Sequence, residues 1–333
     1  MRAISQNRLG GPEVLELVDI ERPTPGPTQI LVRVHAAGVN PVDWKTRETG
    51  GIGPMGDPPF ILGWDVSGVV EEVGAGASLF SPGDEVFGMP SFPFQAGAYS
   101  EYVAAPSRHF ARKPSTLDHV HAAAVPLAGL TVWQSLVDTA DIQPGQRVLV
   151  HAAAGGVGHL AVQIAKARGA YVIGTASAAK HEFLRGLGAD ELIDYRTTDF
   201  AEEVRDVDVV LDTIGQEYGP RSLKTLRRGG RLVQLTRTND ERLPELADAA
   251  GVTAGFTLAE PDRAGLLALA ELVDSGHLKP TIDTVFLLEE AAKAQELVAA
   301  GKTTGKVVLS VADRGPRNAP GPSVEPSMTQ RLL

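Results

Sequence analysis

The chain has 333 residues, of which 43% are hydrophobic and 22% charged, so it is long enough for two compact domains with apolar cores. The formal net charge of −10 and the lack of a basic patch argue against nucleic acid or an anionic membrane as a partner. Cysteine is absent, which excludes disulfides, thiolate nucleophiles and Cys-ligated zinc. With no apolar signal segment and no membrane-spanning run, we expect a cytoplasmic protein.

The first third of the chain predicts short strands joined by turns. Alternating apolar residues predict strands over 29–36, 66–73 and 99–104. Residues 74–84 predict a loop that ends in the turn Ser81-Pro82-Gly83-Asp84, and residues 92–97 predict a second loop. This pattern indicates an antiparallel, barrel-like domain.

From about residue 118 the pattern changes to alternating helices and strands. A helix in two pieces is predicted over 119–138, with strands starting at 147, 171, 207 and 231. Such alternation is typical of a doubly wound parallel sheet, that is, a Rossmann domain, and it places the chain in the α/β class.

The C-terminal third is expected to return to the first domain. It predicts helices over 262–275 and 289–299 and strands over 283–287 and 306–311. We therefore expect residues 1–124 and 262–312 to form one domain, residues 125–261 the Rossmann domain, and the proline-rich residues 313–333 a disordered tail.

A glycine-rich turn follows the predicted strand at residue 147. Ala152, Gly155 and Gly158 match the pattern AxxGxxG, a loose form of the dinucleotide-binding fingerprint, and Gly156 and Val157 complete the turn. Glycines let the backbone turn tightly and bring the amides of the following helix close to a pyrophosphate. The alternative is a strand-to-helix turn with no ligand, but the strand before and the helix after it favour a cofactor site.

The end of the second Rossmann strand indicates which cofactor binds. NAD-selective sites usually carry an acidic residue there that accepts a hydrogen bond from the ribose 2′-hydroxyl. This chain instead has Ser177 and Lys180, a hydroxyl and a cation that suit a 2′-phosphate. The alternatives are a helix cap for Ser177 and a solvated side chain for Lys180. The missing acid favours NADP over NAD.

Several ordered motifs resemble those of the medium-chain dehydrogenase/reductase superfamily. They are AAGVNPVDWKTR (36–47), LGWDVSGVVEEVG (62–74), PGDEVFG (82–88), GAYSEY (97–102), PLAGLTVWQSL (126–136), AAAGGVG (152–158) and TTGKVVL (303–309). Within that superfamily the chain is similar to the zinc-independent quinone oxidoreductase branch, which includes alkenal and enone reductases. The resemblance implies a GroES-like catalytic domain beside the Rossmann domain. It also implies a homodimer that pairs the Rossmann sheets, with residues 252–258 as the candidate edge.

The resemblance also implies further site residues. It places Asn40 and Asp43 near the nicotinamide, and Lys45 and Trp64 at the pocket entrance, where Lys45 could hydrogen-bond a developing enolate or touch a cofactor phosphate. The remaining implied cofactor contacts are Thr131, Tyr195, Gly305 and Lys306. The structural alternatives are an Asx turn at 40–43, a helix cap at Thr131, a core-edge aromatic at Tyr195 and a solvated strand end at Lys306.

Zinc ligands of the zinc-dependent relatives are replaced in this chain. The stretch Gly63-Trp64-Asp65 stands where those relatives have a GHE motif, so Trp64 occupies the position of the histidine ligand. The eight histidines show no metal-ligand spacing, and we predict no metal site.

These observations predict an NADPH-dependent reductase of quinones or α,β-unsaturated carbonyl compounds. Such acceptors spread charge by conjugation, so hydride transfer to them does not require a Lewis acid. Two alternatives stay open: an enoyl-thioester reductase of fatty acid or polyketide metabolism, and a weakly catalytic NADPH-binding structural protein. The expected partners are a small-molecule acceptor and a second copy of the chain, with no nucleic acid and no membrane.

Overall fold

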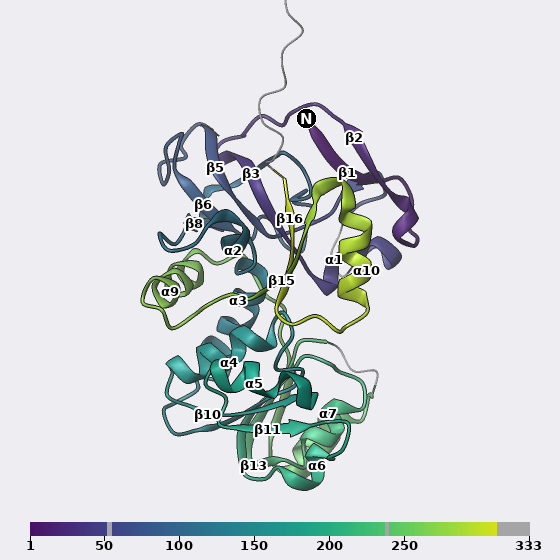
Figure 1. The fold of residues 1–333 in the computed structure, drawn as a ribbon, viewed down its shortest axis with the longest axis vertical. Helices are drawn as coiled ribbons and strands as arrows, with labels where there is room; N and C mark the ends of the chain where they lie inside the picture. Colours follow the sequence, from purple (N-terminus) through teal and green to yellow (C-terminus); the bar gives the residue numbers. More distant parts are fainter. Residues whose placement is uncertain (52–54, 237–239, 312–333) are drawn as a thin grey trace, which may run out of the picture.

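The computed structural model of the protein describes residues 1–51, 55–236 and 240–311. The tail predicted over 313–333 lies outside these residues. Figure 1 shows a β-rich region at the top, formed by the start of the chain, and an α/β region at the bottom. The last two strands, β15 and β16, belong to the upper region and reach down toward the lower one.

The upper region is built on a mainly antiparallel sheet whose centre is the long strand β3. Its spatial order is β15-β16-β3-β5-β6-β8, and β7 also pairs with β3. The bounds are β3 (Gln29–Val39), β5 (Val66–Val73), β6 (Glu85–Gly88), β7 (Tyr102–Pro106), β8 (Phe110–Arg112), β15 (Ile282–Leu287) and β16 (Lys306–Ser310). The end of the chain thus pairs directly with β3, with Val307 opposite Val39.

A small sheet closes the side of this region. Its order is β2-β1-β4, with β1 (Arg2–Gln6), β2 (Leu15–Asp19) and β4 (Phe60–Ile61). The strand predicted over 99–104 is shorter than expected, because β7 begins at Tyr102. The carbonyl of Tyr99 instead accepts from Ile4 N in β1, and its N–H donates to the carbonyl of Leu62, which follows β4. Residue 99 is therefore held by the small sheet and the segment after it rather than by β3.

The lower region is a six-stranded parallel sheet in the order β11-β10-β9-β12-β13-β14. Its strands are β9 (Arg147–Val150), β10 (Tyr171–Ala176), β11 (Glu191–Asp194), β12 (Val207–Asp212), β13 (Leu226–Gln234) and β14 (Thr253–Phe256). Numbered along the chain this is the order 3-2-1-4-5-6, in which ligands bind outside the carboxyl ends of the strands where the order reverses. The predicted Rossmann domain is confirmed.

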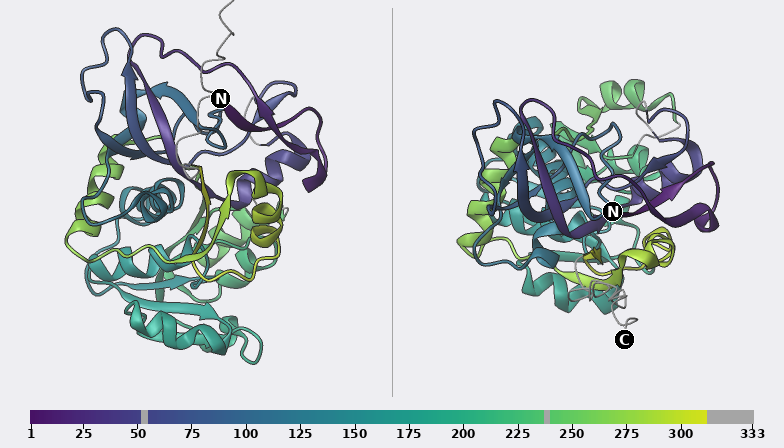
Figure 2. Two further views of the ribbon diagram at one scale, coloured as in Figure 1. Left: turned by 45° about the horizontal axis from the view of Figure 1, so that its top comes forward. Right: turned by 90° about the horizontal axis from the view of Figure 1, so that it is seen from above.

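Helices cover this sheet and link it to the upper region (Figure 2). The helices of the lower region are α4 (Gly158–Ala167), η4 (Ala178–Lys180), α5 (His181–Gly186), α6 (Phe200–Glu203), α7 (Tyr218–Ser222) and α8 (Leu243–Ala250). The others are η1 (Pro12–Val14), α1 (Pro41–Thr49), η2 (Ser107–His109), α2 (His119–Ala123), α3 (Pro126–Val132), η3 (Trp133–Thr139), α9 (Arg263–Asp274), η5 (Leu288–Glu290) and α10 (Ala291–Ala299). The helix predicted over 119–138 forms in three segments rather than two, because Pro126 starts a new helix and η3 is of π type.

Among the described residues, none of the helices combines the length and the apolar character that crossing a bilayer requires.

Candidate cofactor and active site

The glycine turn lies between the end of β9 and the start of α4. The carbonyl of Ala152 accepts a hydrogen bond from Gly155 N at 2.9 Å. A Cβ on Gly158 would lie 2.3 Å from the same carbonyl oxygen, which is closer than any real contact. Glycine at position 158 is therefore required for the close approach of the helix to the strand.

The amides at the start of α4 are available to a ligand. Within the described ranges, no hydrogen bond partner is present for the N–H groups of Gly156, Val157 and Gly158. These three consecutive amides lie at the positive end of a ten-residue helix. Such a cradle fits the pyrophosphate of a dinucleotide, in agreement with the prediction from the sequence.

The carboxyl ends of β10 and β11 bring together the side chains expected at the adenosine phosphate. Ser177 is buried, and its hydroxyl has no hydrogen bond partner in the described part of the chain, so it does not cap η4 through its side chain. Lys180 Nζ donates to the carbonyls of Lys302 and Thr303, at 2.9 and 2.7 Å. Tyr195 follows β11 and is 48% exposed, so it is not part of the core.

A second cation lies beside Lys180. Burial lowers the pKa of Lys180, the carboxylate of Asp283 opposes this, and the nearby guanidinium of Arg196 lowers the pKa further. The same guanidinium lies 5.8 Å from the centre of the Tyr195 ring. Two cations and an exposed aromatic ring therefore surround the position where an NAD-selective site has an acid.

Asn40, Asp65 and Lys306 form a buried polar cluster where β16 meets β3. Asn40 Nδ2 donates to Asp65 Oδ2 at 2.7 Å, and Lys306 Nζ lies 3.4 Å from the same oxygen. Lys306 Nζ also donates to Asn40 Oδ1 and, at 3.1 Å, to the carbonyl of Val39. The three hydrogens of the ammonium thus have three protein acceptors, and both ends of the Asn40 amide are bound.

Asp43 lies behind this cluster and contacts it through Asn40. Its Oδ2 accepts from the Asn40 backbone N–H at 2.6 Å and from the Tyr99 hydroxyl at 2.8 Å. Asp43 is fully buried, and burial raises its pKa to about 7 despite these two hydrogen bonds. Asn40 is the N-cap residue of α1 and Asp43 lies in the first turn of that helix, so the Asp43 carboxylate caps the backbone N–H that precedes the helix rather than forming a simple Asx turn.

Two contacts join the cluster to the glycine turn. Gly305 N donates to the carbonyl of Ala154 at 2.9 Å. A Cβ on Gly156 would lie 3.1 Å from Cδ of Lys306, so the aliphatic part of that lysine packs against the turn. The structure thereby brings Gly155–Gly158, Gly305, Lys306 and Asn40 together, although 115 or more residues separate the segments along the chain.

Three other residues expected at the site have different surroundings. Lys45 is exposed, and its Nζ lies 5.6 Å from the centre of the Trp44 ring. The Thr131 hydroxyl donates to the Leu127 carbonyl inside α3, so it is not a helix cap. The expectation that Trp64 shapes a pocket entrance is wrong, because its ring is 1% exposed, packs edge-on against Phe92 and donates to the Phe94 carbonyl.

Two residues of the site were missing from the sequence-based prediction. Asp65 holds Asn40, Lys306 and, at 2.6 Å, the backbone N–H of Leu127. The sequence could have indicated Asp65, because a charged residue within the apolar run LGWDVSGVV is expected to be buried and therefore paired. Arg196 directly follows the predicted Tyr195, but its position in the sequence does not indicate that its guanidinium lies near the Lys180 ammonium.

Within the described residues, no group of three or more His, Asp or Glu side chains has a geometry that could hold a metal ion.

Two family models match the chain. The model described as "Alcohol dehydrogenase GroES-like domain" matches residues 26–115, and the model described as "Zinc-binding dehydrogenase" matches residues 187–309. Together they cover parts of both regions of the fold, which agrees with a GroES-like domain beside a Rossmann domain.

Individual relatives match over almost the whole length. The human protein "Quinone oxidoreductase" is 32% identical over 324 residues, which is 93% of this chain and 97% of that protein. The "2-haloacrylate reductase" of Burkholderia sp is 35% identical over 327 residues, 91% of this chain and 97% of that protein. A solved structure, "Escherichia coli quinone oxidoreductase complexed with NADPH", superimposes with a TM-score of 0.85 at 30% identity, covering 93% of this chain and all of that one.

Proposed function

Because the chain belongs to the zinc-independent quinone oxidoreductase branch of the medium-chain dehydrogenase/reductase superfamily, we propose that it is an NADPH-dependent reductase of quinones or α,β-unsaturated carbonyl compounds. The observation that carries the proposal is the set of three unpartnered amides at the start of α4, together with the cations Lys180 and Arg196 at the ends of β10 and β11.

The groups at the cofactor site each suit one part of NADPH. The amides of Gly156, Val157 and Gly158 bind the pyrophosphate, because they are donors at a helix N-terminus. Ser177, Lys180, Arg196 and Tyr195 bind the 2′-phosphate and the adenosine, because hydroxyls and cations suit a dianion and an exposed ring can stack on a base. An acid in this position would repel the phosphate and favour NAD instead.

Lys180 exchanges partners when the phosphate binds. Its ammonium now donates to two backbone carbonyls of the loop before β16. A phosphate carries negative charge and attracts the ammonium more strongly than a neutral carbonyl does, so binding draws the ammonium toward the ligand. The loop at Lys302 and Thr303 therefore lies beside the bound cofactor, next to the Gly305–Lys306 cofactor contact.

Bound NADPH supplies the hydride, and the chain orients the acceptor and stabilises the charge that develops on it. Asn40 and Lys306 are buried and their polar atoms are already hydrogen-bonded within the protein, so they form a rigid side of the site. Thr131 lies on α3, whose first turn is held by Asp65 through Leu127 N. Asp43 is a positioning residue that holds Asn40, and the exposed Lys45 donates to the acceptor oxygen as it gains negative charge.

The relatives support both acceptor classes. The human relative bears the name quinone oxidoreductase, and the bacterial one is named for reduction of 2-haloacrylate, an alkene conjugated to a carboxylate. Quinones and conjugated alkenes both accept hydride with charge spread over the conjugated system. We therefore assign a conjugated, electron-poor acceptor and leave its class to be decided by the assay.

The same proposal includes a homodimer formed through β14. This strand is the last in its sheet, and Leu258, which follows it, is 38% exposed. An exposed strand edge of this kind pairs readily with a second copy.

A panel of acceptors tests the proposed function. Purified protein is mixed with NADPH and, separately, a quinone, a conjugated enone and an enoyl thioester, and the loss of NADPH absorbance is followed. Turnover with the quinone or the enone supports the proposal. Turnover with the thioester alone assigns the protein to the enoyl-thioester reductases, and NADPH binding without any turnover assigns it to the structural relatives.

A further inference from the structure

Residues 275–281 join α9 to β15 and run along α4, the helix that begins at the glycine turn. Leu278 and Pro280 of this connecting segment are buried. Two side chains of α4, His159 and Gln163, are one helical turn apart and are both buried. Both make hydrogen bonds to the backbone of the connecting segment.

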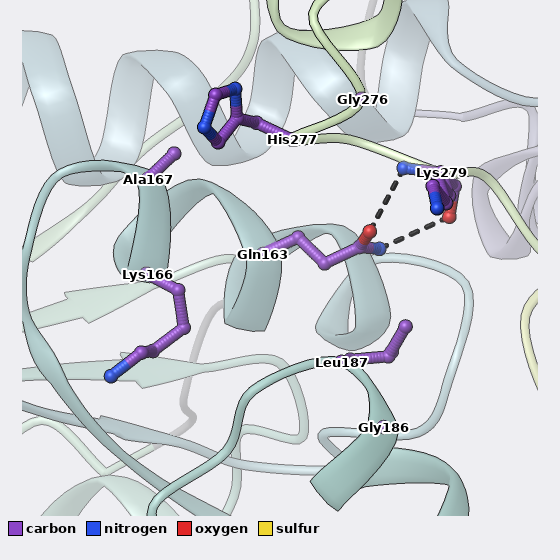
Figure 3. Close-up of a pocket in the computed structure, with 8 residues that line it drawn as sticks. All are labelled: Gln163, Lys166, Ala167, Gly186, Leu187, Gly276, His277 and Lys279. Atoms are coloured by element: carbon purple, nitrogen blue, oxygen red, sulfur yellow. Dashed lines mark hydrogen bonds between the residues drawn. The ribbon is translucent and has the colours of Figure 1, made fainter.

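Gln163 holds the segment at Lys279. Its Oε1 accepts from Lys279 N at 2.8 Å, and its Nε2 donates to the carbonyl of Lys279 at 3.1 Å (Figure 3). One amide thus binds both backbone groups of one residue, which fixes the position of the segment along the helix. A cavity of about 250 Å³ lies beside this contact, between α4 and the turn after α5.

His159 holds the segment at Thr281 and, at the same time, contacts the glycine turn. Nδ1 lies 2.9 Å from the carbonyl oxygen of Gly155, and Nε2 lies 3.1 Å from the backbone N of Thr281. A carbonyl only accepts and an N–H only donates, so Nδ1 carries the proton and Nε2 accepts. The ring is fully buried, and burial lowers its pKa to about 4, so the neutral tautomer is the stable form near pH 7.

The hydrogen bonds continue from Thr281 to the Asn40 cluster. The carbonyl of Thr281 accepts from Lys306 N at 2.8 Å. The ammonium of the same lysine binds Asn40 and the carbonyl of Val39. Gly155, His159, Thr281, Lys306 and Asn40 therefore form one unbroken hydrogen-bonded path between the two halves of the site.

We infer that His159 is a positioning residue that couples the glycine turn to the Lys306–Asn40 cluster. Its Nδ1–H is a second donor to the Gly155 carbonyl, beside the backbone N–H of residue 159, and helps to fix the direction of the amides that follow. Its Nε2 fixes Thr281 and, through Thr281, the lysine that adjoins the reacting end of the cofactor. The inference rests on the proposed function, because that proposal assigns the turn to the pyrophosphate and the cluster to the nicotinamide.

Two conservative substitutions test the bonds of His159 to Gly155 and to Thr281 one at a time. In His159→Asn the amide nitrogen lies where Nδ1 was and keeps the bond to Gly155, but nothing reaches Thr281. In His159→Gln the amide oxygen lies where Nε2 was and keeps the bond to Thr281, but the Gly155 carbonyl loses its side-chain donor and keeps only the backbone N–H of residue 159. Loss of one buried hydrogen bond corresponds to about a tenfold change in an equilibrium or rate constant.

The experiment measures the Kd for NADPH by its fluorescence and kcat with the best acceptor for each variant. We expect His159→Gln to raise Kd about tenfold with kcat nearly unchanged, and His159→Asn to lower kcat about tenfold with Kd nearly unchanged. His159→Leu, which loses both bonds, is expected to change both constants. His121→Asn, an exposed histidine of α2, is the matched control and is expected to behave like the wild type.

The inference would be overturned if the Asn and Gln variants changed Kd and kcat equally. It would also be overturned if both variants unfolded at a lower temperature while Kd and kcat stayed the same as in the wild type. Kd is measured without an acceptor. If the wild type binds NADPH but reduces nothing, the proposed function fails while the difference in Kd between the two variants still decides the inference. A wild type that binds no NADPH overturns both.

Discussion

The Lys306 ammonium and the Asp65 carboxylate lie 3.4 Å apart inside the protein, with side-chain exposures of 2% and 0%. Asp65 also binds Asn40 and the first turn of α3, so one carboxylate joins β16, the residue that follows β3, and α3. Removing one partner of such a pair leaves a buried charge without compensation.

We therefore expect Asp65→Asn to lower the free energy of unfolding by about 3–5 kcal/mol. Lys306→Met in the same chain removes the uncompensated charge, so the double variant is expected to cost less than the sum of the two single variants. Denaturant unfolding of the four proteins measures this. Strict additivity, or an Asp65→Asn protein as stable as the wild type, would refute the role of the pair.

Gly158 is expected to be essential for the cofactor turn. In Gly158→Ala the new methyl group collides with the Ala152 carbonyl, so the start of α4 must move away from β9. NADPH affinity is then expected to fall at least tenfold, which is about 1.4 kcal/mol. Gly186→Ala in α5 is the control, because a Cβ there meets nothing within 4 Å. Equal NADPH affinities in the two variants would show that the turn does not bind the cofactor.

Lys180 is expected to select NADPH over NADH. Because its ammonium is assigned to the 2′-phosphate, Lys180→Ala should raise KM for NADPH by tenfold or more and leave KM for NADH nearly unchanged. Lys293→Ala, which removes an exposed lysine paired with Glu290, is the control. Steady-state rates with both cofactors give the comparison, and an equal rise for NADPH and NADH would exclude the phosphate contact.

Asp43 is expected to make stability depend on pH. Its pKa is about 7 in the folded protein against 3.8 as a reference value, so the unfolded chain loses this proton first as the pH rises. Stability therefore falls between about pH 4 and 7, by on the order of 1 kcal/mol per pH unit, and levels off above pH 7.

Asp43→Asn removes this proton while keeping an oxygen that can accept from Asn40 and Tyr99. The wild type should lose stability relative to the variant between pH 5 and pH 8, as measured by denaturant unfolding at both values. Asp57→Asn, at an exposed position, is the control. A difference between wild type and Asp43→Asn that is constant with pH would show that Asp43 is ionised throughout.

The proposed dimer is expected to depend on the edge of β14. Thr257 N bonds inward to Gln234, so by alternation the N–H of Ala254 points away from β13. Ala254→Pro removes that donor without breaking the pairing with β13. Light scattering should give twice the 35.1 kDa chain mass for the wild type and a single-chain mass for the variant. A wild-type monomer would contradict the dimer.

The sequence predicted the Rossmann half well because its signals are local. The strand at Arg147, the glycines and the helix after them are consecutive, and each element has its own periodicity. In the first region, α1 and the short strands β4, β6 and β8 were not predicted. Their positions depend on contacts with distant strands rather than on their own few residues.

The candidate site residues that could be named from the sequence belong to motifs, whereas the candidates that were missed join the site only through tertiary contacts. Ser177, Lys180 and the glycines could be assigned from spacing, whereas Arg196 joins them only because β10 and β11 end side by side. The family resemblance placed Trp64 at a pocket entrance, but its large ring packs into the core instead. The sequence places His159 on a helix but does not show its contact with the connecting segment, which depends on the tertiary structure.

The most direct test of the account is multiple-turnover oxidation of NADPH, with a quinone and with a conjugated enone, in the presence and absence of a strong chelator. We expect many molecules of NADPH to be oxidised per chain with at least one acceptor, at a rate that the chelator does not change. No oxidation with either acceptor, or activity that the chelator abolishes and zinc restores, would contradict it.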